Sequence, residues 1–109
     1  MSDGFVEAAK AGELAPGRMK RVNIGGRCVL LANVAGHYYA VDDTCTHEDA
    51  SLSSGFLKDD LVKCPLHGSR FNVCTGAALE EPAQIALRTY PVRLEGERIL
   101  IEIHCAGMA

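Results

Sequence analysis

The 109-residue sequence has no apolar run that approaches the about 18–20 residues needed to cross a bilayer. Its first ten residues, MSDGFVEAAK, do not place a basic segment before an apolar one, so they do not resemble a secretory signal. The sequence also has no glycine-rich fingerprint for a nucleotide or a flavin. We therefore expect a cytoplasmic protein that stays off membranes, keeps its thiols reduced and does not take electrons from NAD(P)H by itself.

The sequence also has no excess of basic residues over acidic ones. Eleven Lys and Arg residues face 14 Asp and Glu residues, which gives a net charge of −3. A nucleic-acid-binding domain would need the opposite sign and a clustered basic face, so this class is set aside. The negative charge is concentrated in residues 38–81, where eight acidic residues outnumber three basic ones. This segment either steers a basic protein partner or is simply a solvated surface.

What is present indicates one globular domain that spans residues 1–109. Hydrophobic residues make up 48% of the chain and charged residues 23%, which excludes a disordered chain. Gly25-Gly26 separates two apolar, β-branched runs, 19–24 and 27–34, and this arrangement favours a hairpin. We expect a further strand over 38–41 after a turn at 34–37. Several short strands with glycine-containing turns predict an all-β sandwich or barrel.

Apolar and charged residues alternate with a period of two near the C-terminus. Tyr90, Val92 and Leu94 precede the turn 95–97, and the isoleucines at 99, 101 and 103 follow it. We expect a half-buried antiparallel hairpin here. Helix signals are weak, and only the segment 7–14, which ends before Pro16-Gly17, favours a helical turn.

The segment from Asp42 to Pro82 breaks the strand pattern and reads as loops on the β scaffold. It contains Cys45-Thr46-His47 and, sixteen residues later, Cys64-Pro65-Leu66-His67-Gly68-Ser69. One or two intervening residues let the Cys and the His of each motif point to one centre. The pattern therefore predicts a metal site with two thiolates and two imidazoles. Solvated loop charges remain our interpretation of the pairs Asp42-Asp43 and Glu80-Glu81.

Three interpretations of the four candidate ligands remain open on spacing alone. Structural zinc would use two Cys and two His, although zinc usually prefers two like ligands in each arm. A chance arrangement without metal is the second. The third is a [2Fe–2S] cluster in which two His replace two Cys on one iron, and this division explains why each arm has one residue of each kind.

The segments CTHEDASLSSGFL and CPLHGSRFNVCTGAALEEPA resemble the Rieske iron–sulfur proteins, above all the small ferredoxins of bacterial ring-hydroxylating dioxygenase systems. The resemblance implies an antiparallel β-sandwich with a small cluster-binding subdomain of two loops, about 43–55 and 63–76. It implies that Cys45 and Cys64 bind the inner iron, and that His47 and His67 bind the outer iron. It places other residues beside the cluster, namely Pro65, Gly68, Ser69, Phe71 and Pro82. A partner-docking tip would consist of His47, Glu48, Asp49, Leu66 and His67.

The departures from the quinol-oxidising Rieske proteins indicate a low potential. Ala50 and Leu66 stand where those proteins have two further cysteines in a disulfide, and Phe71 stands where they have a tyrosine that bonds a ligand sulfur. Fewer donors to sulfur leave the reduced cluster less stabilised. We expect a potential near about −150 mV, the low end of the Rieske range.

The resemblance implies a one-electron carrier rather than an enzyme. It would be a monomer with one cluster, and it would pass electrons from an NAD(P)H-dependent reductase to a terminal oxygenase. The alternative is the small Rieske subunit of an NAD(P)H nitrite reductase, and a zinc-stapled binding domain is less favoured. We expect Cys28, Cys74 and Cys105 to be buried small hydrophobes. His37 and His104 are expected to bind no metal.

Overall fold

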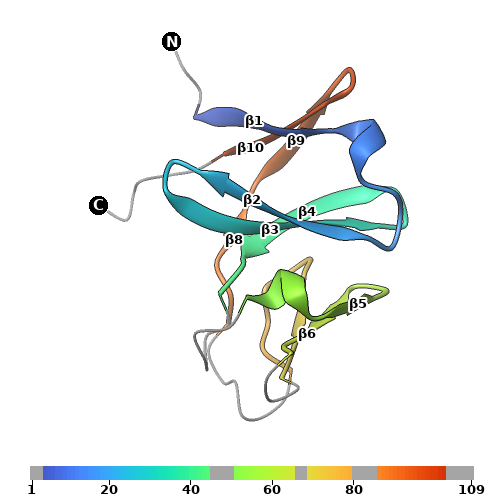
Figure 1. The fold of residues 1–109 in the computed structure, drawn as a ribbon, viewed down its shortest axis with the longest axis vertical. Coiled ribbons are helices and arrows are strands. Elements are labelled where there is room, and N and C mark those ends of the chain that lie inside the picture. The colour runs from blue at the N-terminus through green and yellow to red at the C-terminus, as the bar shows by residue number, and fades with distance from the viewer. Residues whose placement is uncertain (1–3, 45–50, 66–68, 80–85, 103–109) are drawn as a thin grey trace.

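The computed structural model describes residues 4–44, 51–65, 69–79 and 86–102, and it confirms an all-β protein built from antiparallel sheets (Figure 1). Within these ranges it has three sheets and no α-helix, and no helix there is long and apolar enough to cross a membrane. The elements are β1 Phe5–Lys10, η1 Ala11–Glu13, β2 Met19–Ile24, β3 Arg27–Val34, β4 His37–Asp42, η2 Leu52–Ser54, β5 Phe56–Lys58, β6 Leu61–Lys63, β7 Arg70–Asn72, β8 Thr89–Tyr90, β9 Val92–Glu95 and β10 Arg98–Glu102.

The sheets have the strand orders β1-β10-β9, β2-β3-β4-β8 and β5-β6-β7. The predicted β2–β3 hairpin is confirmed, with Gly25 and Gly26 at φ values of 60° and 81°. Positive φ at both central residues is what a tight hairpin turn of the primed type requires, and glycine adopts it without strain. The strand expected over 38–41 is also confirmed, as part of β4.

Strand β3 is buried on both faces because it lies between two hydrophobic cores. Val29 and Leu31 belong to the core that the first two sheets share, which makes these sheets a sandwich. Leu30 and Ala32 face the other way, into a core that they share with residues of β6 and β7. This double burial explains the uninterrupted apolar run of the sequence, since alternate side chains of a strand point to opposite faces.

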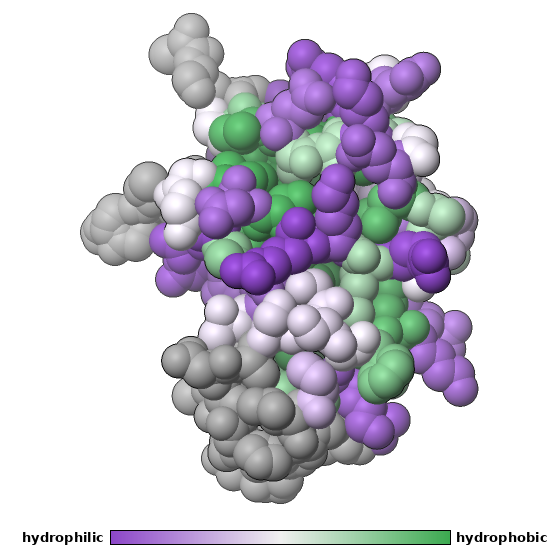
Figure 2. Space-filling model, viewed as in Figure 1, coloured by the Kyte–Doolittle hydropathy of each residue, from purple (hydrophilic) through white to green (hydrophobic). Residues whose placement is uncertain are grey.

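The predicted C-terminal hairpin is confirmed over β9 and β10, but its burial is uneven. Tyr90 belongs instead to β8 of another sheet, and Ile103 lies outside the described residues. Ile99, Leu100 and Ile101 are all buried, whereas Leu94 on β9 is 52% exposed. Strand β10 is the central strand of its sheet and β9 is an edge strand, so the alternation of β9 does not translate into a buried face. Figure 2 shows hydrophilic side chains over much of this upper part of the molecule, with apolar atoms between them.

Two expectations about secondary structure need correction. The helical turn expected within 7–14 is present only as the 3-10 turn Ala11–Glu13, because residues up to Lys10 form β1, which pairs with β10. The middle of the chain is not loop alone. Strands β5, β6 and β7 form a third sheet below the sandwich (Figure 1), so the small subdomain has a sheet of its own.

Tyr90 on β8 provides a pH-dependent contribution to stability. Its hydroxyl donates a hydrogen bond to Asp42 Oδ1 and accepts one from Arg27 Nη1 at 3.5 Å. Burial, and then the bond to Asp42, raise the pKa of Tyr90 from 10.0 to about 12. The fold thus favours the protonated phenol, so this contribution is complete below pH 10 and is lost as the pH rises toward 12.

We expect Tyr90→Phe to unfold at a lower urea concentration than the parent protein at pH 8, and the gap to narrow above pH 10. Urea midpoints of both proteins from pH 8 to about 11.5 measure it. A gap that stays constant or widens above pH 10 would contradict the role of the Tyr90 proton.

Candidate metal centre

The first predicted cluster loop begins and ends at one backbone contact. Thr44 and Ser51 form an isolated antiparallel bridge, which brings together the two ends of the segment 45–50. Cys45, His47, Glu48, Asp49 and Ala50 lie in that segment, outside the described residues. The described part of the chain therefore shows that the two ends of the segment 45–50 lie side by side.

Asp43 holds the base of this first loop together. Its carboxylate accepts hydrogen bonds from the hydroxyl of Ser51 and, at 2.8 Å, from the backbone N–H of Ser53. Its backbone carbonyl accepts from Leu52 N at 2.6 Å. Because Asp43 is only 2% exposed, our expectation of a solvated loop charge is wrong for this residue. A buried carboxylate is tolerated when hydrogen bonds and a cation compensate it.

Arg21 on β2 supplies that cation. Its Nε lies 3.7 Å from Asp43 Oδ2, and its Nη2 donates to the sulfur of Cys28 at 3.1 Å. The bond to Cys28, and after it the charge of Asp43, raise the pKa of the Arg21 guanidinium. Cys28 is partly exposed and not the buried hydrophobe that we expected. Sequence reasoning missed Arg21, because nothing local links it to a loop that begins more than twenty residues later.

Cys64 begins the second loop directly after β6. Its side chain is 2% exposed and is part of the core that adjoins this sheet. Its backbone N–H donates to the carbonyl of Ser69 at 2.8 Å, so the ends of the segment between them are also held together. Leu66, His67 and Gly68 lie in that segment and are outside the described residues.

The bases of the two loops pack against each other. Leu52, from the end of the first loop, lies in the same core as Cys64. Gly55 approaches the start of the second loop so closely that a Cβ there would meet the Lys63 carbonyl oxygen at 2.0 Å and Pro65 Cδ at 3.1 Å. This contact requires glycine. The fold thereby brings together the two segments on which the predicted ligands are carried.

These observations fit a cluster held by two Cys and two His. Cys64 is a buried thiol in no disulfide, at the closed base of one loop, and the base of the other loop lies against it. Within the described ranges no three His, Cys, Asp or Glu side chains gather as a metal site, and three of the four predicted ligands lie outside those ranges.

Three of the residues that we expected to lie beside the cluster, Pro65, Ser69 and Phe71, are in the described part of the chain. Ser69 and Phe71 are fully buried, and Phe71 shares the core of Cys64, whereas Pro65 is exposed. Pro82 lies outside the described residues, as does the pair Glu80-Glu81. A buried phenylalanine has no hydroxyl to donate to sulfur, as the low-potential interpretation requires.

The other candidate cysteines and histidines are placed as follows. Cys74 is partly buried against the core that contains Cys64, and its N–H donates to Asn72 Oδ1 at 2.7 Å. Its sulfur, by hydrogen bonding, is the main cause that raises the pKa of Tyr39. His37 is exposed at the start of β4. Cys105 and His104 lie outside the described residues.

The chain is similar to known proteins along almost its whole length. The family described as Rieske [2Fe-2S] domain matches residues 4–91. The chain is 46% identical to the ferredoxin component of biphenyl 2,3-dioxygenase from Rhodococcus jostii, over 91% of this chain and 92% of the relative. It is 40% identical to the ferredoxin component of the naphthalene 1,2-dioxygenase system from Pseudomonas aeruginosa, over 94% and 99%.

A solved structure shows the same fold. It is the complex of reduced oxygenase and oxidized ferredoxin in carbazole 1,9a-dioxygenase, in which the matched chain is 34% identical with a TM-score of 0.87. The match covers 93% of this chain and 94% of that one. The expected family, fold and cofactor are thus confirmed: the chain belongs to the Rieske [2Fe–2S] family, and its cofactor is a Rieske-type [2Fe–2S] cluster.

Proposed function

We propose that this chain is the ferredoxin component of a multicomponent dioxygenase system, which carries single electrons from an NAD(P)H-dependent reductase to a terminal oxygenase. The observation that carries the proposal is the identity of 46% to a dioxygenase ferredoxin along nearly the whole length of both chains. A permanent nitrite reductase subunit is the weaker alternative, because the relatives named above are ferredoxin components. Co-purification with a large enzyme would favour that alternative.

The proposed ligands are Cys45 and Cys64 for the inner iron and His47 and His67 for the outer iron. The cluster supplies a site that accepts and releases one electron at a time. Burial of Cys64 supports its place on the inner side, since a thiolate in the core is shielded from water. Imidazoles on the outer side would form the docking tip, together with Glu48, Asp49 and Leu66.

The chain itself sets the environment of the cluster. Phe71 is buried and has no hydroxyl that could donate a hydrogen bond to a ligand sulfur. The reduced, more negative cluster is therefore less stabilised than it would be with a tyrosine at this position. Asp43 adds a buried negative charge at the base of the first loop, and Arg21 offsets part of it. These features support a potential at the low end of the Rieske range, near about −150 mV.

We also propose that the protein works as a cytoplasmic monomer. An electron shuttle presents the same tip to two partners in turn, and a dimer that covered the tip would block both. The chain makes and breaks no substrate bond in this scheme. In this scheme the terminal oxygenase binds and converts the final substrate.

A reductive titration followed by low-temperature EPR tests the function. We expect a Rieske-type signal that appears near about −150 mV. This value would suit an acceptor of electrons from a reductase that uses NAD(P)H. A midpoint well above zero would contradict our reading of Ala50, Leu66 and Phe71, and with it the dioxygenase assignment. Zinc without iron in the metal analysis would contradict the cluster itself.

A further inference from the structure

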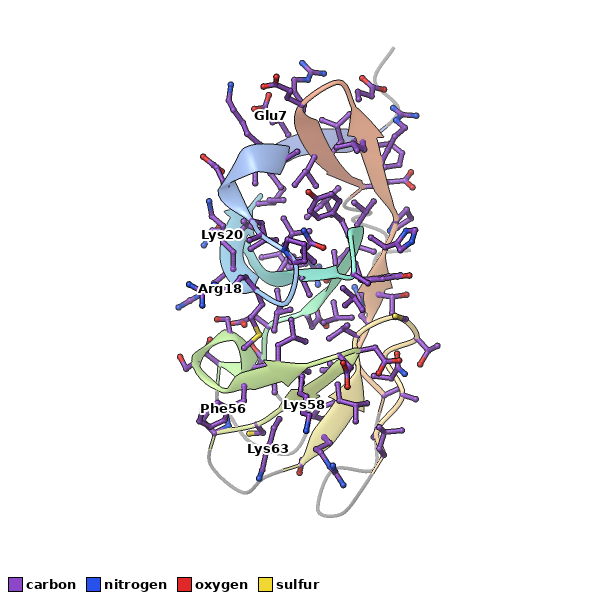
Figure 3. All side chains as sticks on the ribbon, turned by 90° about the vertical axis from the view of Figure 1, so that its right-hand side faces the viewer. Glu7, Arg18, Lys20, Phe56, Lys58 and Lys63 are labelled. Atoms are coloured by element: carbon purple, nitrogen blue, oxygen red, sulfur yellow. The ribbon has the colours of Figure 1, made fainter. Side chains whose placement is uncertain are left out.

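The outer face of the β5-β6-β7 sheet combines basic and apolar side chains around one hollow. The hollow has a volume of about 490 Å³. It is lined by Phe56, Lys58, Asp59, Leu61, Lys63 and Arg70, which we call the basic–apolar face. Figure 3 shows Phe56, Lys58 and Lys63 on the β5–β6 hairpin, well apart from Arg18 and Lys20.

The strand register explains why these side chains share a face. Phe56 pairs with Lys63, and Lys63 pairs with Arg70, so the three form one row across the sheet. In the adjacent row Val62 and Phe71 are fully buried and Leu57 is partly buried, and this row packs into the core. Since successive side chains of a strand alternate between faces, the row of Phe56 points outward.

This face has two features that the isolated fold does not need. Phe56 is 71% exposed, although aromatic side chains of this size are usually covered. Lys58 and Lys63 are exposed on the same face and place two positive charges beside the ring. A partner that covers the aromatic ring and offers carboxylates to these two lysines would use both features.

The distribution of charge indicates the chemistry of the partner. Residues 38–81 contain only three basic residues, Lys58, Lys63 and Arg70, and all three line this hollow. One carboxylate, that of Asp59, lines it with them. A positive area within an acidic segment selects a surface that carries carboxylates, and Phe56 selects an apolar contact beside them.

The face is continuous with the second cluster loop. Lys63 directly precedes Cys64, Arg70 directly follows Ser69, and the N–H of Cys64 donates to the carbonyl of Ser69. A protein that covers the basic–apolar face therefore also lies beside the cluster. We propose that this face is a docking surface for a redox partner whose own surface presents carboxylates next to an apolar patch. This inference rests on the proposed function and extends the docking site beyond the acidic loop tip.

Stopped-flow electron transfer tests the face with the reductase and the terminal oxygenase of the Rhodococcus jostii biphenyl dioxygenase system as probes. We expect Lys63→Glu and Lys58→Glu each to lower the second-order rate constant about tenfold at low ionic strength with at least one of the two partners. The loss should shrink at high salt, which screens exposed charges. Phe56→Ser should lower the rate constant about tenfold at every salt concentration, because an apolar contact is not screened.

Matched controls separate the face from general effects of charge and polarity. Arg18→Glu makes the same change in net charge at an exposed site, and Leu94→Ser removes an exposed apolar side chain on β9. Both should transfer electrons at the parent rate. Lys58 lies six positions before Cys64, whereas Lys63 is adjacent to it, so agreement between the two reversals excludes a local distortion of Cys64. The EPR spectra of all variants should match that of the parent.

The outcomes decide the proposal. Equal rates for the face variants and the controls, with both partners, would overturn the docking surface while leaving the proposed function intact. Faster transfer by Lys63→Glu would overturn the acidic character of the partner surface. Failure of the parent protein to exchange electrons with either partner, although dithionite reduces its cluster, would overturn the proposed function and the docking surface together.

Discussion

Cys64→Ala is expected to abolish the cluster, whereas Cys74→Ala is expected to leave it in place. Both cysteines are free, both contact the same core, and they lie ten positions apart, so the pair is well matched. Only Cys64 starts a loop whose two ends are joined, and only Cys64 belongs to a Cys-x-x-His motif. Loss of a residue that merely supports a ligand weakens metal binding about 10–100-fold, so loss of a ligand should exceed that.

Iron content and visible absorption measure the cluster in both variants. For Cys64→Ala we expect iron per chain to fall more than about tenfold. Circular dichroism then shows whether the sandwich persists without the cluster. Retention of the cluster in Cys64→Ala would mean that this thiol is only a core residue. Loss in both variants would point to core packing as the cause and would remove the argument for ligation.

The sequence predicted the parts of the fold that depend on neighbouring residues. The turn at Gly25-Gly26 and the alternation around the turn 95–97 are local signals, and each gave a hairpin that the structure confirms. The metal motifs are local as well, since each joins one Cys to one His across one or two residues. For this reason the family and its cofactor could be predicted from the sequence alone.

The parts that failed depend on partners distant in the sequence. The alanine-rich segment around Ala8 and Ala9 has a helical preference, but pairing with β10, some ninety residues later, makes it a strand. Strands β5, β6 and β7 have three residues each, which is too short for a period of two to stand out. Their inward row is recognisable only after the sheet is assembled.

The site shows the same limit in its charges. The pair Asp42-Asp43 has the composition of an exposed loop, yet Asp43 is buried. Its carboxylate accepts hydrogen bonds from Ser51 and Ser53 and is paired with Arg21 on β2. A burial that depends on three separate segments leaves no pattern in a single one. Gly55 is similar, because the need for glycine there comes from the carbonyl of Lys63 across the β5–β6 pair.

Gly55→Ala is therefore expected to destabilise the protein and to lower its cluster content. The added methyl group would lie 2.0 Å from the Lys63 oxygen, a backbone atom that cannot rotate away. The two segments must separate, and Phe56↔Lys63 is the ladder pair next to the contact. Overpacking of this kind costs about 3 kcal/mol. For a domain of this size that lowers the melting temperature by about 12 °C or more.

Thermal melts followed by circular dichroism and by cluster absorbance measure this effect. Gly12→Ala is the matched control, since a Cβ at exposed Gly12 meets nothing within 4 Å. We expect Gly12→Ala to melt within about 2 °C of the parent, because surface substitutions rarely exceed about 0.5 kcal/mol. If Gly55→Ala matched it in both melting temperature and iron content, the close approach of the two loop bases would be refuted. We expect Gly55→Ala to lose more cluster than its lower stability alone explains. The displaced carbonyl belongs to Lys63, which directly precedes Cys64, so the distortion should reach the proposed ligand.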